Sequence, residues 1–394
     1  MSETIRKYIK GDRIIWMVII ALAVFSSLVV YSATGNLAYK HHDGNAIYYL
    51  FRHAKFLLVG IAIIVGVHHL NYKWFARFAV VFLYLAIALL AITLLSGVSL
   101  NQASRWLTVP VVGISFQPSE IAKLALMMYI AKVLAQYQSN DRNADEAFKP
   151  IIIHVGIVCA LIFREDFSTA GLIGATSLIV MFIGRVSLKY ILGTVGAVVL
   201  FVVVILWLSE YVPFLHRAST WKARIERFVG SDDGAKEVSS ADYQSERSKM
   251  AIATGGFMGK GPGNSHQRYF LPHPYSDFVY AIITEEFGFI GAFFVMLAYL
   301  ILLFRSGVIV RASTRTFPAF LVVGLSTLLC VQAFINMGVA VGVFPVTGQP
   351  LPLVSMGGTS TLFTCLALGA ILSVSRNNME EKMEAEQESV EQTS

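Results

Sequence analysis

Charged residues are scarce in this chain of 394 residues. Lys, Arg, Asp and Glu together make up 14% of the sequence, whereas a soluble domain carries roughly a quarter. Hydrophobic residues account for 56%, and this composition alone is typical of a membrane protein. The formal net charge is +6, but the basic residues lie between apolar segments instead of forming one patch, so we expect no nucleic-acid partner.

Cysteine is also rare. Cys159, Cys330 and Cys365 each lie inside an apolar run, and their spacing is typical of neither a disulfide nor a metal site. We interpret them as fillers that face lipid or the core. The first apolar run, from Ile14, lacks a cleavage site of small residues, so we predict a retained first span and not a signal peptide.

Long apolar runs are abundant. A transmembrane helix needs about 20 mostly apolar residues, and ten segments meet or approach that length. They are 14–34, 54–70, 77–97, 117–136, 150–164, 169–185, 189–209, 278–304, 317–337 and 355–376. We therefore predict an all-α polytopic membrane protein with ten transmembrane helices, each satisfying its own backbone polar groups.

Basic residues indicate the orientation of these helices. With a cytoplasmic N-terminus, most Lys and Arg fall in inside segments, and the short outside loops hold only Lys40, Arg52, Lys55, Arg105 and Arg164. Both termini are then cytoplasmic, and a large extracytoplasmic loop separates helices 7 and 8. The predicted parts are an N-terminal arm (1–13), helices 1–7 (14–209), the outer loop (210–277), helices 8–10 (278–377) and a disordered cytoplasmic tail (378–394).

Asp277 stands where the outer loop re-enters the membrane, in the stretch LPHPYSDFVYAIITEEFG. It can cap the following helix, because a carboxylate there offsets exposed amides and the helix dipole. It can instead be a general base at the water–lipid boundary, where partial desolvation raises a carboxyl pKa. Glu285 and Glu286 lie deeper, and at least one must face the bundle interior because a charge turned to lipid is costly.

Three further polar sites interrupt the apolar pattern. Glu120 and Lys123 share a helix face and can pair, either as a structural ion pair at the membrane edge or as part of an internal polar cavity. Asp166 in REDFST can face the outer surface or cap a helix. Residues 343–360, VFPVTGQPLPLVSMGGTS, break helix periodicity, and we favour a re-entrant segment over a compact outer loop because irregular backbone at membrane depth must be buried in protein.

The outer loop is cationic. Its basic residues include Arg224 and Lys260, and the run GKGPGNS, which ends at Ser265, contains glycines that let backbone amides approach an anionic group. This run matches no nucleotide-binding motif, and a flexible connector is the alternative. Arg105 joins a cation to the interfacial aromatic Trp106, and an interfacial anchor is its alternative role. Such a surface suits a phosphate-bearing lipid head group or anionic lipid in general.

Several of these motifs together resemble the SEDS family (shape, elongation, division and sporulation). The resemblance rests on VVYSATG, QPSEIAKLA, RYFLPHPYSDFVYAIITEEFGFIGA and FPVTGQPLPLVSMGGTS, in order over roughly 14–377. It implies a ten-helix bacterial inner-membrane enzyme that polymerises lipid II into peptidoglycan and works with a class B penicillin-binding protein. The charged N-terminal arm and TGQPLPLVSMGGTS are more similar to the division branch than to the elongation branch, which implies the septum and other divisome membrane proteins as partners.

The resemblance also assigns roles to individual residues. The family's proposed catalytic carboxylate lies in a motif HTDF, which here is Tyr275-Ser276-Asp277-Phe278, so the Asp is kept and the His is replaced. The family motif QPDFGTA corresponds to residues 164–170, REDFSTA. The acidic residue is kept as Asp166, and the Pro is replaced. The family motif SYGGSS corresponds to residues 355–360, SMGGTS, in which Met356 replaces the Tyr. Glu120 and Lys123 match the polar pair of the family's fourth span.

This reaction displaces a lipid diphosphate from an anomeric carbon by a sugar 4-hydroxyl, with inversion. The reaction needs a base, and we expect Asp277 in that role. It also needs cations at the departing diphosphate, for which the candidates are Arg105, Arg224 and Lys260. A divalent Mg²⁺ or Mn²⁺ can share that task. Glu120, Lys123, Asp166 and Ser265 complete the predicted substrate-binding set. A lipid II flippase, an elongation-type polymerase and a non-catalytic scaffold are the alternatives.

Overall fold

The computed structural model describes residues 10–41, 45–96, 98–100, 103–108, 115–139, 144–163, 165–208 and 240–391. Most of them are helical. The α-helices are α2 (Arg13–Ala33), α3 (Gly35–His41), α4 (Ala46–His68), α5 (Tyr72–Ser96), α6 (Pro118–Ser139), α7 (Phe148–Phe163), α8 (Phe167–Ile183), α9 (Leu188–Leu208), α11 (Ser240–Gly255), α12 (Val279–Ala312), α13 (Thr316–Ala340) and α14 (Thr359–Glu391). Two short 3-10 helices, η1 (Ala144–Ala147) and η3 (Gln267–Tyr269), complete the helical elements.

Every predicted span coincides with one of these helices. Within the described residues, eight helical segments are long and apolar enough to cross a membrane: α2, α4, α5, Ala144–Phe163, α9, α12, α13 and α14. Helix α8 is apolar but shorter, and α6 carries Glu120, Lys123 and Lys132. The chain is thus a multi-pass helical membrane protein, while the count of ten spans, their orientation and the placement of the large loop stay predictions.

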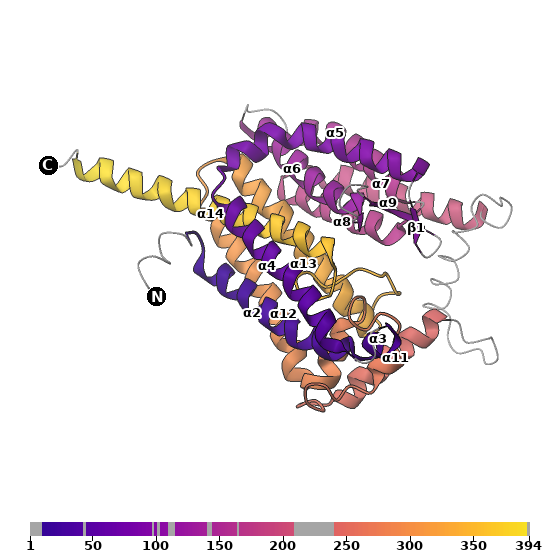
Figure 1. The fold of residues 1–394 in the computed structure, drawn as a ribbon. Helices are drawn as coiled ribbons and strands as arrows, with labels where there is room; N and C mark the ends of the chain where they lie inside the picture. The colour runs from indigo at the N-terminus through magenta and orange to yellow at the C-terminus, as the bar shows by residue number, and fades with distance from the viewer. Residues whose placement is uncertain are drawn as a thin grey trace.

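Helix α13 lies at the centre of the molecule. Helices α5 to α9 form one group, and α2, α4 and α12 form another (Figure 1). Helix α13 contacts α6 and α8 of the first group and α12 of the second, and it also contacts α14. Its buried residues are distributed around the whole helix, as expected for an apolar helix enclosed by others.

A small sheet departs from the all-α prediction. Strands β1 (Val98–Leu100), β2 (Ala103–Thr108) and β3 (Ser115–Phe116) form a three-stranded antiparallel sheet between α5 and α6, in the order β1-β2-β3. The strands are too short to give a clear alternation of polar and apolar residues, and strands are usually recognised by that alternation. The sequence analysis therefore missed them.

The predicted disorder of the tail is wrong as far as Glu391, because α14 continues to that residue. Side chains tie the start of the tail to the bundle: Asn378 Nδ2 donates to the Ile309 carbonyl at 3.0 Å, and Thr314 Oγ1 donates to Glu381 at 2.7 Å. Glu380 pairs with Lys10 at 3.0 Å. Beyond these contacts the segment is rich in Glu, Ala, Gln and Met, which are strong helix formers. The helix extends away from the bundle (Figure 1).

Helix α12 is broken at Gly288, which has φ 66° and ψ −164°. The segment after α11 replaces the lost helical hydrogen bonds. The amide of Phe289 donates to the Gly256 carbonyl at 3.0 Å, and the amides of Lys260 and Gly261 donate to the carbonyls of Glu285 and Glu286, both at 2.9 Å. A Cβ atom at Gly288 would lie 2.3 Å from the Phe257 carbonyl oxygen, so only glycine fits this approach.

We predict that Gly288→Ala destabilises the protein and Gly307→Ala does not. The first change forces a side chain into a positive-φ conformation, which costs on the order of 1–3 kcal/mol, and drives it into backbone. Gly307 lies in the same helix with nothing within 4 Å of an added Cβ. Thermal unfolding of both purified variants in detergent checks this. Equal melting temperatures would contradict the assigned role of the kink.

Candidate functional site

Asp277 lies in the loop immediately before α12. Phe278 occupies the N-cap position and its side chain makes no capping hydrogen bond, so Asp277 stands one residue before the cap and not at it. Its carboxylate is half-buried, and Oδ1 accepts a hydrogen bond from Ser276 Oγ at 2.8 Å. The other oxygen, Oδ2, lies 3.6 Å from where a Cβ atom on Gly348 would be. The carboxylate therefore lies beside the irregular segment that follows α13.

Three consecutive backbone carbonyls hold the Asp277 loop in place. The carbonyl of Tyr275 accepts from the Met356 amide at 2.9 Å, and that of Ser276 accepts from Ser355 Oγ at 2.6 Å. The carbonyl of Asp277 accepts from Asn336 Nδ2 at 2.9 Å. Because each carbonyl has its own donor, the backbone that carries the carboxylate is fixed residue by residue.

The donors come from α13 and from residues 341–358, which are not helical. In this segment Leu351, Leu353 and Val354 are buried. Its backbone is satisfied by side chains: Gln349 O accepts from Asn336 Nδ2 at 2.7 Å, and Pro350 O accepts from Gln332 Nε2 at 2.9 Å. Residues 349–355 are thus irregular backbone enclosed largely by protein, whereas Val343 and Phe344 are exposed, and the predicted re-entrant path through a membrane stays a prediction.

The predicted Glu120–Lys123 pair is present and connects to this segment. Lys123 Nζ lies 2.8 Å from Glu120 Oε1, and both side chains are buried. The same Nζ donates to Gln332 Oε1 at 3.1 Å. The ammonium group of Lys123 thus binds the oxygen of the Gln332 side chain, and the NH₂ group of that side chain donates to the Pro350 carbonyl. A buried charge pair in α6 is therefore two hydrogen bonds from the segment beside Asp277.

Asp166 joins the same network from α8. Its Oδ1 accepts from the Thr169 amide at 3.0 Å, so it is the N-cap of α8, which was the plainer of its two predicted roles. Thr169 Oγ1 in turn accepts from Gln349 Nε2 at 2.8 Å. Asp166 also lines a small cavity together with Gln117 and Ser119 at the start of α6. The structure therefore brings together Asp277, Asp166, Glu120 and Lys123 through residues 349 and 350.

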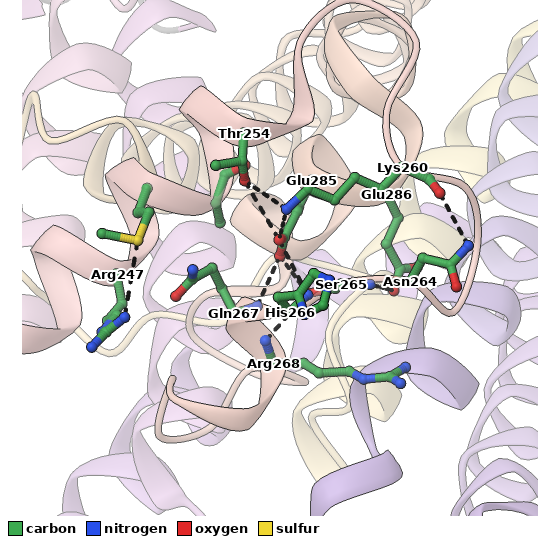
Figure 2. Close-up of polar contacts among 12 residues, drawn as sticks. Arg247, Thr254, Lys260, Asn264, Ser265, His266, Gln267, Arg268, Glu285 and Glu286 are labelled. Atoms are coloured by element: carbon green, nitrogen blue, oxygen red, sulfur yellow. Dashed lines mark hydrogen bonds and ion pairs between the residues drawn. The ribbon is translucent and has the colours of Figure 1, made fainter.

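Glu285 and Glu286 both face the protein interior and bind the outer loop (Figure 2). The Glu285 carboxylate accepts from Lys260 Nζ at 2.6 Å, from Ser265 Oγ at 2.5 Å and from the Gln267 amide at 3.1 Å. Glu286 Oε1 accepts from the Ser265 amide at 3.3 Å and from Ser32 Oγ of α2. These contacts fasten residues 260–267 to the first part of α12.

This arrangement gives Lys260 and Ser265 a structural role. Both are bound to Glu285, and their predicted contact with diphosphate stays a prediction. Arg224 lies outside the described residues, as does the side chain of Arg105, whose backbone belongs to β2. No group of three or more His, Cys, Asp or Glu side chains that could hold a metal occurs in the described part of the chain, and the predicted Mg²⁺ or Mn²⁺ stays a prediction.

Tyr275, which replaces the histidine of the family motif, is half-buried beside Asp277. Burial raises the pKa of its hydroxyl, and the nearby Tyr49 and Asp277 raise the pKa further, whereas Arg52 lowers it. The hydroxyl is therefore protonated at neutral pH and can donate a hydrogen bond. His273 Nδ1 lies 3.3 Å from Tyr275 Oη, so an imidazole remains in the loop although its position has changed.

The sequence analysis missed Gln332, Asn336, Gln349 and Ser355, which hold Asp277 and its neighbouring segment. One signal could have found two of them. Gln332 and Asn336 are four residues apart in an otherwise apolar span, and polar residues in a span usually face the bundle interior. No comparable signal marks Gln349 or Ser355, because the partners of their side chains, the Thr169 hydroxyl and the Ser276 carbonyl, lie in distant segments.

Known proteins resemble this chain over nearly its whole length. The family model for FtsW, RodA and SpoVE, described as cell cycle protein, matches residues 12–380. A protein of Trichlorobacter lovleyi named "Probable peptidoglycan glycosyltransferase FtsW" is 33% identical over 383 residues, which cover 95% of this chain and 96% of that protein. The protein of the same name from Geobacter metallireducens is 31% identical, over 92% and 94%.

Two solved structures share the fold. One, from a study of structural coordination of polymerization and crosslinking by a peptidoglycan synthase complex, has a TM-score of 0.73 at 23% identity and covers 93% of this chain and 98% of its own. The other, rod shape determining protein RodA of Thermus thermophilus, has a TM-score of 0.67 at 22% identity, with 94% and 99% covered. At these identities the likeness concerns the fold alone.

We predict that Lys260→Met loosens the outer loop. The change leaves the buried Glu285 carboxylate without its cation, and an unpaired buried charge is strongly destabilising. Limited proteolysis should therefore cut within residues 256–268 faster than in the wild type. A raised KM at unchanged proteolytic resistance would instead assign Lys260 to substrate binding.

We predict that Lys123→Met destabilises the protein by about 3–5 kcal/mol, the usual cost of leaving a buried charge unpaired. Adding Glu120→Gln should recover most of that loss, because the carboxylate that needed the ammonium group is then neutral. Thermal unfolding of the two single variants and the double variant measures this coupling. Additive effects would show that the pair does not act as a unit.

Proposed function

We propose that this chain, which belongs to the FtsW/RodA/SpoVE family of cell cycle proteins and is a peptidoglycan glycosyltransferase, polymerises lipid II into glycan strands at the division septum. The division role is supported by the relatives named FtsW and by the sequence features that resemble the division branch. Lipid II suits the architecture, because its sugars can reach Asp277 in the loop before α12 while its polyprenyl tail lies among apolar helices.

Asp277 is the proposed general base. The observation that carries this assignment is the fixed backbone of residues 275–277, which holds a half-buried carboxylate outside the helix cap. A base must lie within hydrogen-bond reach of the attacking hydroxyl, and a fixed backbone supports this role because it holds the carboxylate in one position. Asp277 removes the proton from the sugar 4-hydroxyl, the oxygen forms a bond to the anomeric carbon of the second lipid II, and undecaprenyl diphosphate leaves with inversion.

The leaving diphosphate needs positive charge or hydrogen-bond donors nearby. Arg105 and Arg224 are the proposed cations, because both are basic residues of segments that the sequence predicts on the outer side. Tyr275 adds a protonated hydroxyl beside Asp277. A divalent cation bound by the diphosphate itself would supply further charge, and no step above depends on it.

The proposed setting is the bacterial inner membrane with the Asp277 loop on the outer side. The proposed partner is a class B penicillin-binding protein, which would cross-link the strands that this chain makes. The fold-level likeness to a chain from a peptidoglycan synthase complex supports such an assembly. Other divisome membrane proteins are proposed to recruit the pair to the septum.

We predict that Asp277→Asn lowers lipid II polymerisation at least about 100-fold, the lower range of general-base contributions. The measurement is glycan-strand synthesis from lipid II by the purified complex with its class B partner. Glu246→Gln is the matched control, since Glu246 is an exposed carboxylate of α11. Wild-type synthesis by Asp277→Asn would refute the base assignment, and lipid II movement across vesicles without polymer would favour transport.

A further inference from the structure

Helix α13 carries two buried amide side chains on one face. Gln332 and Asn336 are four residues apart, and their exposed fractions are 3% and 1%. Amides are costly in an apolar interior unless they are hydrogen-bonded. Both are bonded, and both donate to backbone carbonyls outside their own helix. The two side chains therefore hold backbone segments other than α13.

Asn336 joins two segments that are far apart in the sequence. Its single NH₂ group donates to Asp277 O at 2.9 Å and to Gln349 O at 2.7 Å. One turn earlier, Gln332 donates to Pro350 O and is itself oriented by Lys123. The two amides thus hold residues 349 and 350 against α13, and Asn336 adds the residue that carries the carboxylate.

The hydrogen bonds of Asn336 are directed at backbone. Its NH₂ group donates to two carbonyls in segments that are distant in the sequence, whereas its buried Oδ1 atom accepts no hydrogen bond from the described protein atoms. The amide therefore acts as a donor that fixes the positions of these two carbonyls relative to each other.

We propose that Asn336 is a positioning residue for Asp277, and that it acts by fixing the backbone carbonyl of Asp277 relative to residues 349–356. This inference rests on the proposed function. Ser355 completes the support, since its Oγ donates to Ser276 O and accepts from the Leu351 amide at 2.8 Å. A misplacement of about 1 Å can cost on the order of 100-fold in rate, so the effect falls on kcat and not on substrate binding.

The experiment uses Asn336→Ala in the complex with the class B partner. We expect kcat for lipid II polymerisation to fall roughly 10- to 100-fold, with KM within about threefold of the wild type. Hydrogen–deuterium exchange of the backbone amides in residues 269–280 should become faster. The matched control is Ser326→Ala, because Ser326 is buried in the same helix and its Oγ donates only within that helix.

A second pair of variants separates positioning from a merely structural role. In the Asp277→Asn background, which blocks turnover, Asn336→Ala should leave the affinity for lipid II unchanged, because the substrate site remains folded. If Asn336→Ala does not fold, Ser355→Ala replaces it, since that change removes the donor to Ser276 O and should give the same lowered kcat and faster exchange.

The outcomes are distinct. Lower kcat, unchanged KM and faster exchange limited to residues 269–280 support the inference. Wild-type kcat for Asn336→Ala, or parallel losses of lipid II affinity and thermal stability, overturns it. An active Asp277→Asn enzyme would refute the proposed base, whereas an inactive Asp277→Asn with a fully active Asn336→Ala would refute only the positioning role.

Discussion

The hydrogen bonds to three successive carbonyls, Tyr275, Ser276 and Asp277, are the constraint on which the site depends. A loop between a soluble segment and a membrane helix has many conformations, and ordering it costs conformational entropy. Here each of these three carbonyls has a donor from elsewhere in the fold. The position of one carboxylate therefore depends on α13, on residues 341–358 and, through Lys123 and Gln332, on a charge pair in α6.

A second anchor holds the other side of the same loop. Glu285 and Glu286 bind residues 260–267, and Glu286 also reaches Ser32 at the end of α2. The residues between these two anchors, 268–274, are thus held from both ends. Buried carboxylates are costly in a membrane protein, and in this fold each one has partners that stabilise its charge. The two networks of polar residues thus hold opposite ends of the stretch that carries Asp277.

Apolar length predicted the helices well, because each span must satisfy its own backbone and bury or expose whole faces. Charge in apolar surroundings predicted the Glu120–Lys123 pair and the inward-facing Glu285 and Glu286. The features that the sequence did not predict have a common cause. The kink at Gly288, the binding of Lys260 to Glu285 and the support from Asn336 all depend on contacts between distant segments, and periodicity in one segment carries no information about them. The tail was misjudged because composition alone was weighed, without the contacts of Asn378 and Glu381 that hold the continuing helix α14 against the bundle.

The break at Gly288 divides the work of α12 between its two parts. Residues 289–312 are about 36 Å long at 1.5 Å per residue, which is enough to cross the hydrocarbon layer of roughly 30 Å without help. The stretch from Val279 to Phe287 is therefore not needed as a span. Bilayer thickness can set the tilt of residues 289–312, while the angle of residues 279–287 is set by the outer loop and by Ser32 of α2. A thicker or thinner bilayer can consequently change the tilt of residues 289–312 and leave the orientation of the Asp277 carboxylate unchanged.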